Sequence, residues 1–181
     1  EKVVISHTDR EEVEVKVRQL FEELQNILRG VFLIGDLSQK TSDKIVSYRE
    51  RLSSLIISKV IDGAQLYDAS TFIKTNKQFS HHIPDLERSN ELIRETFAKM
   101  PPPHVAVVPG FVSSSHDNND ITNLGRGGSD YTASIIAAAM NASVLEIWTD
   151  VDGFMTADPK IINSAYVIDE LSFTEAIELT N

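Results

Sequence analysis

A glycine-rich loop over residues 125–128 carries the strongest chemical signal in the sequence. Glycines let backbone N–H groups come close to an anion, and the Ala- and Ile-rich stretch from Tyr131 to Met140 predicts a helix whose positive end faces the loop. The loop is therefore predicted to hold an anion or a phosphate. The Walker A motif does not fit, because Ser129 and Asp130 stand where a Lys-Ser or Lys-Thr pair is required.

An arginine lies inside this loop. Arg126 is flanked by Gly125 and Gly127, and a tight turn alone does not require an arginine there. A guanidinium can bind a carboxylate through two parallel hydrogen bonds. We therefore interpret Arg126 as a carboxylate ligand. A simpler interpretation stays open, in which the loop is only a turn and Ser129 is the N-cap of the following helix.

Polar residues also follow the apolar segment 144–148, which predicts a strand. Open α/β sheets bind ligands just beyond the carboxyl ends of their strands, so we expect a nucleotide here. For Asp152, before Gly153, an ordinary turn is the favoured interpretation. The candidate nucleotide contacts are Thr149, Asp150, Asp158 and Lys160.

The periodicity of apolar residues places these segments in an α/β fold. A β-branched run at 104–108 is typical of a strand that is buried on both faces. Strand, helix and strand in succession imply parallel pairing with right-handed crossovers. The predicted helices cover residues 8–30, 41–63, 85–99, 131–140 and 174–179, and the predicted strands cover residues 64–67, 104–108 and 144–148.

The segment 113–120 differs from its surroundings because it is rich in Ser, Asn and Asp. Inside a compact α/β domain such a stretch is more often a functional loop than a domain boundary. We therefore interpret it as a functional loop. The chain shows no internal repeat and no low-complexity linker, so one domain is expected.

The composition excludes several classes of protein. The 181 residues carry a formal net charge of −10, which repels a phosphate backbone, so we expect no nucleic-acid partner. No run of about 18 apolar residues could span a bilayer, so we expect no membrane association. The chain has no cysteine and its five histidines are scattered, so we expect no protein-bound metal, and the composition suits the cytosol.

Three motifs in register resemble the core of the aspartate kinases. They are LGRGGSDY at residues 124–131, EIWTDVDG at 146–153 and TADP at 156–159. The similarity covers residues 41–181, whereas residues 1–40 match only weakly as a helical segment. The resemblance implies a three-layer α/β/α sandwich of the amino-acid-kinase type with a mainly parallel central sheet that is incomplete at its N-terminus. Residues 1–181 would then form a single partial catalytic domain.

The same resemblance implies an activity. Aspartate kinases transfer a phosphoryl group from ATP, with Mg²⁺ held mainly through the phosphates, to the side-chain carboxylate of L-aspartate. The product, 4-phospho-L-aspartate, serves lysine, threonine and methionine biosynthesis. The partners implied are therefore L-aspartate and ATP, in the cytoplasm. A sheet that lacks a strand exposes an unpaired edge, so we also expect a homo-oligomer.

The resemblance assigns roles to individual residues. Arg126 is expected to hold the α-carboxylate of aspartate and Glu50 its ammonium group, although Glu50 alone would be interpreted as a surface carboxylate paired with neighbouring arginines. Asp130 is expected to orient cationic groups near the transferred phosphate. The substrate pocket is expected to include Gly127, Gly128 and Ser129, and the nucleotide contacts are expected to be Thr149, Asp150, Met155, Asp158 and Lys160.

One family motif has no match in the chain. Aspartate kinases begin with a Lys-Phe-Gly-Gly-Thr-Ser segment whose lysine binds the transferred phosphate, so we expect the chain to be a fragment that is inactive alone. A fusion of the parent protein to a homoserine dehydrogenase stays open. Two alternative functions also stay open: another amino-acid kinase, acting on glutamate, acetylglutamate or a nucleoside monophosphate, and a non-catalytic nucleotide-binding module.

Overall fold

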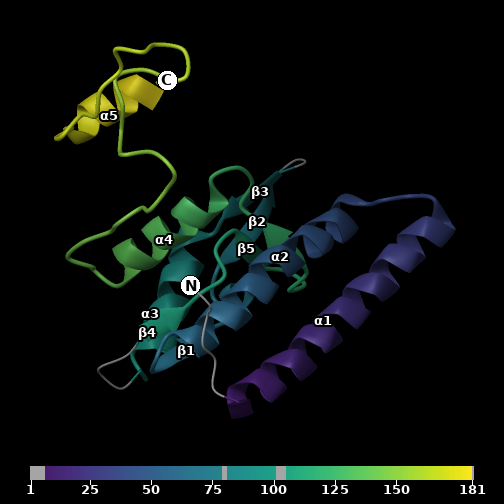
Figure 1. Ribbon diagram of the computed structural model, residues 1–181. Coiled ribbons are helices and arrows are strands. Elements are labelled where there is room, and N and C mark those ends of the chain that lie inside the picture. The colour runs from purple at the N-terminus through teal and green to yellow at the C-terminus, as the bar shows by residue number, and fades with distance from the viewer. Residues whose placement is uncertain (1–6, 79–80, 101–104, 181) are drawn as a thin grey trace. The chain divides into compact units, whose positions relative to one another are not determined.

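The computed structural model describes residues 7–78, 81–100 and 105–180, which form two compact units that divide between Leu145 and Glu146. The first unit contains, in chain order (Figure 1), α1 (His7–Ile34), α2 (Gln39–Val60), β1 (Ala64–Leu66), a 3₁₀ turn η1 (Ala69–Thr71), β2 (Lys74–Gln78), β3 (His81–Pro84), α3 (Leu86–Phe97), β4 (Val105–Val107), β5 (Val112–Ser115), β6 (Ile121–Asn123) and α4 (Gly128–Ala139). The second unit contains α5 (Phe173–Thr180).

The described strands of the first unit form two sheets. β1 pairs with β4 in parallel, and a four-stranded sheet has the order β3-β2-β5-β6. In that sheet the central pair β2 and β5 is parallel, and the two outer pairings are antiparallel. Parallel strands separated by helices confirm the α/β class, and the larger sheet is mixed.

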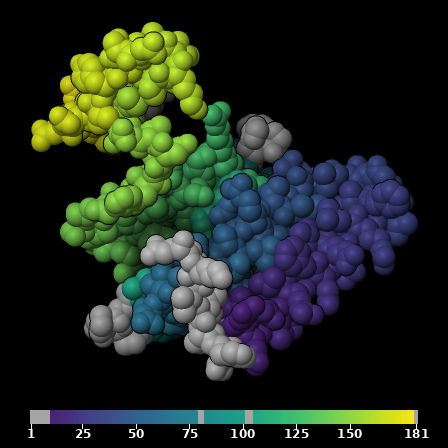
Figure 2. Space-filling model, in the orientation of Figure 1, coloured from purple at the N-terminus to yellow at the C-terminus, as the bar shows by residue number. Residues whose placement is uncertain are grey.

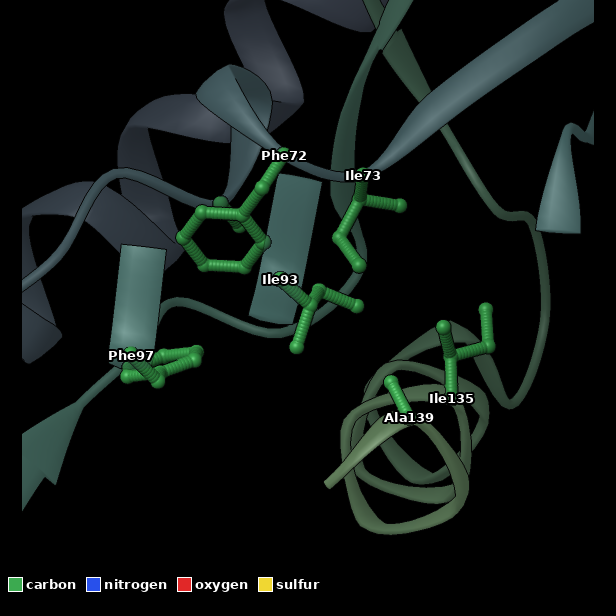
Figure 3. Packing of buried hydrophobic residues seen from close by; sticks show 7 residues of the cluster. Phe72, Ile73, Ile93, Phe97, Ile135 and Ala139 are labelled. Carbon is green, nitrogen blue, oxygen red and sulfur yellow. The ribbon is translucent and has the colours of Figure 1, made fainter. Parts of the chain in front are cut away.

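A hydrophobic cluster joins α3 and α4 to the segment between η1 and β2. Figure 3 shows Ile93 and Phe97 of α3 beside Phe72, and the rings of Phe72 and Phe97 meet edge to face with centroids 5.6 Å apart. Ile135 and Ala139 line one stripe of α4, since residues four apart share a helix face. This burial fixes α4, whose N-terminus follows the glycine loop.

Helix α1 packs along α2, as Figures 1 and 2 show. The buried Tyr48 of α2 donates its hydroxyl hydrogen bond to Glu23 Oε2 of α1 at 3.0 Å. Burial, with the Glu23 carboxylate as the second cause, raises the pKa of Tyr48 above its usual value. An ion pair of 3.0 Å between Lys59 and Glu12 joins the same two helices.

The first helix is longer than the sequence indicates, whereas the second begins two residues earlier and ends three residues earlier than the expected 41–63. The first continues through Gly30 to Ile34, because a glycine in an exposed helix costs only about 1 kcal/mol relative to alanine. Gly35, at φ +70°, follows the helix in the left-handed conformation. The second helix begins at Gln39 because Ser38 is its N-cap and accepts a hydrogen bond from the Thr41 N–H at 3.2 Å.

The prediction of a loop over 113–120 is wrong for its first half. Residues 112–115 form β5, a central strand whose four residues are all buried. The Ser113 hydroxyl pairs with Thr122 Oγ1 at 2.9 Å, which lies equally close to Thr75 Oγ1, and the Ser114 hydroxyl donates to the Ser70 carbonyl at 2.7 Å. Because hydroxyl pairing replaces apolar packing here, the polar composition suggested a loop where the structure has a strand.

The prediction of a strand over 144–148 is also wrong. These described residues have no regular secondary structure, and the Trp148 side chain is 89% exposed. An apolar run forms a strand only where a neighbouring strand accepts its hydrogen bonds, and the run alone does not specify that neighbour. The strand predicted at 104–108 exists as β4, but Val105 is 43% exposed, so it is not buried on both faces. His104 lies outside the described residues.

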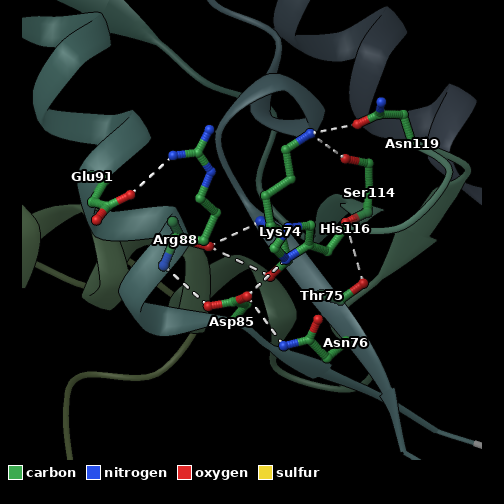
Figure 4. A network of polar contacts seen from close by, with 10 residues as sticks. Lys74, Thr75, Asn76, Asp85, Arg88, Glu91, Ser114, His116 and Asn119 are labelled. Atoms are coloured by element: carbon green, nitrogen blue, oxygen red, sulfur yellow. Dashed lines mark hydrogen bonds and ion pairs between the residues drawn. The ribbon is translucent and has the colours of Figure 1, made fainter.

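A polar network fixes the start of α3 against β2 and the end of β5 (Figure 4). Asp85 is the N-cap of α3, and its Oδ1 accepts from the Arg88 N–H at 3.0 Å. Its Oδ2 accepts from Asn76 Nδ2 at 3.1 Å and lies 3.0 Å from His116 Nδ1. The Arg88 amide is the largest cause that holds the pKa of Asp85 below its usual value of 3.8.

We expect Asp85→Ala to destabilise the protein by about 1 kcal/mol at pH 7, because α3 loses its N-cap. The folded-state pKa of Asp85 lies below the unfolded value, so its stabilisation is complete above about pH 4 and is lost as the pH falls below 3.8. Urea denaturation of both proteins at pH 7 and at pH 3 measures the difference. Asp85→Asn, which can still cap, is the control. A difference that stays the same at both pH values would contradict the assignment.

Candidate functional site

A cavity of about 650 Å³ lies between α2 and the glycine loop of the first unit. α2 contributes Glu50, and the loop with the start of α4 contributes residues 125–130. Phe111, which follows β4, and further side chains of α1 and α2, Arg49 among them, complete the lining. All six residues predicted to serve substrate binding or catalysis in this unit therefore line one cavity. They are Glu50, Arg126, Gly127, Gly128, Ser129 and Asp130.

Three glycines are required by the shape of the loop. Gly125 and Gly127 have φ values of +73° and +72°, in the left-handed region that favours glycine. Gly128 is constrained by space, since a Cβ atom there would lie 3.0 Å from both Leu124 Cβ and Phe111 Cδ2. The loop therefore packs against Phe111 and presents its backbone at the cavity wall.

The N-terminus of α4 has no side-chain cap. Gly127 is the N-cap residue and forms no capping hydrogen bond, while Ser129 and Asp130 lie inside the first turn. The interpretation of Ser129 as the N-cap is therefore wrong. The Gly128 N–H donates to the Gly125 carbonyl at 3.0 Å, whereas the Ser129 and Asp130 N–H groups have no acceptor among the described residues and can bind an anion at the positive end of the helix.

Arg126 supplies a positive charge at the same place. Its side chain is exposed, and it makes no hydrogen bond or ion pair with any residue in the described ranges. A guanidinium without a protein partner, beside uncapped amides, is arranged to bind an anionic group. A carboxylate fits the planar geometry of its donors.

Glu50 has features both of a surface carboxylate paired with an arginine and of a ligand in the substrate pocket. Its Oε1 accepts from Arg49 Nε at 2.9 Å and from Nη2 at 2.8 Å, as expected of a surface pair. Its side chain is nevertheless only 18% exposed and lines the cavity, whereas that of Arg49 is 87% exposed. An ion pair with so exposed a partner contributes little stability, so the Glu50 carboxylate can exchange Arg49 for a cationic ligand at small cost.

Phe111 is a cavity residue that the sequence did not indicate as functional. Its φ is +71°, a conformation that is strained for a residue with a side chain. The Phe111 N–H donates to Thr132 Oγ1 at 3.0 Å, and its carbonyl accepts from the Leu124 N–H at 3.0 Å, so α4 and the loop hold it. The Pro109-Gly110 pair before it signals a turn, but no sequence pattern predicts a left-handed phenylalanine.

The five predicted nucleotide contacts all lie in the second unit. Met155 pairs with Val167 in an antiparallel bridge. The Asp158 side chain accepts from the Lys160 N–H at 2.9 Å, which forms an Asx turn. Thr149 donates its hydroxyl to Asp150 Oδ1 at 3.2 Å. The unit therefore groups Asp158 with Lys160 and Thr149 with Asp150, and all four of these residues are exposed.

Among the described residues, no group of three or more His, Cys, Asp or Glu side chains is arranged to hold a metal ion. No helix within the described ranges is both long enough and apolar enough to cross a bilayer.

Relatives with curated names are aspartokinases. The chain is 33% identical over 167 residues to lysine-sensitive aspartokinase 3 of Escherichia coli, which covers 87% of this chain and 37% of the relative. It is 35% identical over 166 residues to the chloroplastic aspartokinase 1 of Arabidopsis thaliana, covering 87% of this chain and 29% of the relative. The chain thus spans about a third of the length of these relatives.

Solved structures show the same likeness. The crystal structure of E. coli aspartokinase III in complex with aspartate and ADP has a TM-score of 0.86 at 32% identity, covering 93% of this chain and 38% of that one. The aspartate kinase of Clostridium acetobutylicum has a TM-score of 0.67 at 35% identity, covering 89% and 34%. The amino acid kinase family model matches residues 3–181. The chain therefore belongs to the amino acid kinase family.

Proposed function

We propose that the chain is part of an aspartate kinase, which transfers the γ-phosphoryl group of ATP to the side-chain carboxylate of L-aspartate. The observation that carries this proposal is that Arg126, which has no partner among the described residues, lines the same cavity as Glu50 at the uncapped start of α4. Aspartokinase relatives, one of them solved with aspartate and ADP, support it.

The charges of the cavity suit an α-amino acid. Arg126 binds the α-carboxylate through two N–H donors, and Glu50 accepts from the ammonium group after releasing Arg49. Gly127, Gly128 and Ser129 line the pocket beside them. The side-chain carboxylate of aspartate is then left as the reacting group.

The acceptor needs no general base, because a carboxylate is already ionised at pH 7. Catalysis then consists of aligning two anions and neutralising the charge between them. Uncapped amides at the start of α4 donate toward developing negative charge without reorganising. The Asp130 carboxylate, in the first turn and without a described side-chain partner, orients the cationic groups near the phosphate.

We propose that residues of the second unit bind ATP together with its Mg²⁺. Lys160 supplies an exposed positive charge for a phosphate, and the turn at Asp158 holds its backbone. Thr149, Asp150 and Met155 are the remaining proposed nucleotide contacts. Mg²⁺ is usually bound through substrate phosphates and water, so it requires no dedicated protein cage.

We also predict that the protein forms a homo-oligomer in the cytoplasm. Residues 1–181 are predicted to form one partial catalytic domain, in which residues 41–181 are the family core. Biosynthesis of lysine, threonine and methionine is the pathway that an aspartate kinase would serve.

We expect Arg126→Ala in the full-length protein to raise the KM for aspartate about 10- to 150-fold, because a charge-assisted hydrogen bond contributes about 1.5 to 3 kcal/mol. The KM for ATP should change little. Steady-state kinetics with each substrate varied in turn measures the effect. Arg49→Ala is the matched control: it removes a cation from the same cavity and frees Glu50 for the ammonium group, so the KM for aspartate should not rise.

An unchanged KM for aspartate in Arg126→Ala would remove the carboxylate assignment. Glu50→Gln should give a smaller loss, also confined to aspartate, because the amide oxygen still accepts from the ammonium group. An equal loss for ATP in Glu50→Gln would show instead that α2 has shifted.

We expect Asp130→Asn to lower kcat at least tenfold while the melting temperature stays nearly level. Asp130 caps no helix, so its loss removes only a favourable charge from the first turn of α4, worth about 0.3 to 1 kcal/mol. Turnover and thermal unfolding are measured on the same samples. Ser134→Ala is the control, because Ser134 bonds only the backbone carbonyl of Asp130. Normal turnover together with a large loss of stability would assign Asp130 a structural role.

A further inference from the structure

Asp43 is a buried carboxylate that the proposed reaction does not use. It lies in the second turn of α2, is 3% exposed, and is not part of the cavity lining. Its Oδ1 accepts from Gln39 Nε2 and from Asn123 Nδ2, each at 2.7 Å. Burying a carboxylate is costly unless hydrogen bonds compensate it, and here both described donors are neutral amides.

Asn123 continues this contact into the glycine loop. It is the last residue of β6, and its Oδ1 accepts from the Gly125 N–H at 2.9 Å. A carboxylate can only accept hydrogen bonds, so it forces the Asn123 side chain to turn its NH₂ group toward α2. The amide oxygen must then face Gly125, the residue directly before Arg126. Asp43 therefore decides which way Asn123 points and which loop group it holds.

Asp43 and Glu50 lie on one face of α2. Seven residues are close to two helical turns, so the two side chains point in nearly the same direction, about 10 Å apart along the axis. One face of α2 thus accepts a hydrogen bond from Asn123 through Asp43 and lines the cavity through Glu50. The loop that Asp43 holds carries Arg126.

We propose that Asp43 and Asn123 form a positioning clamp that sets the distance between Arg126 and Glu50. The identity of the ligand, and nothing else in the clamp, rests on the proposed function: in an aspartate site this distance must suit the α-carboxylate and the ammonium group, which share one carbon atom. Neither clamp residue touches the substrate. Loss of the clamp should therefore loosen the loop and weaken aspartate binding while leaving the nucleotide contacts of the second unit unaffected.

The test is an exchange of the two side chains in the full-length protein. Asn123→Asp alone places two carboxylates against each other, so we expect a KM for aspartate at least tenfold higher, an unchanged KM for ATP, and faster hydrogen exchange at the Gly125 amide. Combining Asp43→Asn with Asn123→Asp should restore both. In the combined variant the amide at position 43 donates to the carboxylate at position 123, which accepts from the Gly125 N–H.

Gln39→Ala is the matched control. It removes the other donor to Asp43 Oδ1 but has no link to the loop, so the Gly125 amide and both KM values should stay as in the wild type. If Asn123→Asp does not fold, Asn123→Ala replaces it, with the same expected rise in exchange and in KM. Three results would each overturn the clamp. The Asn123 variants could keep the wild-type KM for aspartate and the wild-type exchange rate of the Gly125 amide. Gln39→Ala could change both as much as the Asn123 variants do, or the exchanged pair could restore neither.

Amide exchange separates this proposal from the proposed function. If the wild-type protein does not use aspartate, yet Asn123→Asp frees the Gly125 amide and the exchanged pair protects it again, then the clamp stands and the aspartate assignment fails. If aspartate is used and the exchange rate of the Gly125 amide does not respond to these substitutions, then the clamp is wrong and the aspartate assignment stands.

Discussion

The N-cap of α4 is Gly127 in the left-handed conformation, and the candidate site depends on this constraint. A side chain there would strain the backbone, and without one the first turn has no cap. The helix is secured from elsewhere: Ile135 and Ala139 are buried, and the Arg94 Nε donates to the Ala139 carbonyl at 3.0 Å. The core therefore stabilises a helix whose start is free to bind an anion.

Close backbone packing around this terminus accounts for the neighbouring glycines and for Phe111. A Cβ atom at Gly110 would lie 2.9 Å from Ser129 Cα, so the turn after β4 packs directly on the first turn of α4. Thr132 and Leu124 hold Phe111 at its positive φ beside Gly128. The turn, the loop and α4 thus form one packed unit, and α2 completes the cavity with Glu50.

Sequence patterns predicted the features that depend on local chemistry. Glycine spacing located the loop, and apolar spacing located α3 and α4, so Arg126 and Ser129 share a cavity mainly because they are neighbours in the chain. Features set by distant partners were missed. Ser113 and Ser114 of β5 are buried because Thr122 and the Ser70 carbonyl pair with their hydroxyls. Glu50 reaches the cavity because Tyr48 packs α2 against α1. The role of Glu50 was indicated only by family resemblance.

Trapping of the acyl phosphate with hydroxylamine tests the central claim most directly. The full-length protein is incubated with ATP, Mg²⁺ and hydroxylamine, and with L-aspartate, glutamate or acetylglutamate in separate reactions. The proposed aspartate site at Arg126 and Glu50 predicts a hydroxamate with aspartate and background levels with the other two. A hydroxamate from glutamate or acetylglutamate, with none from aspartate, would contradict the assignment.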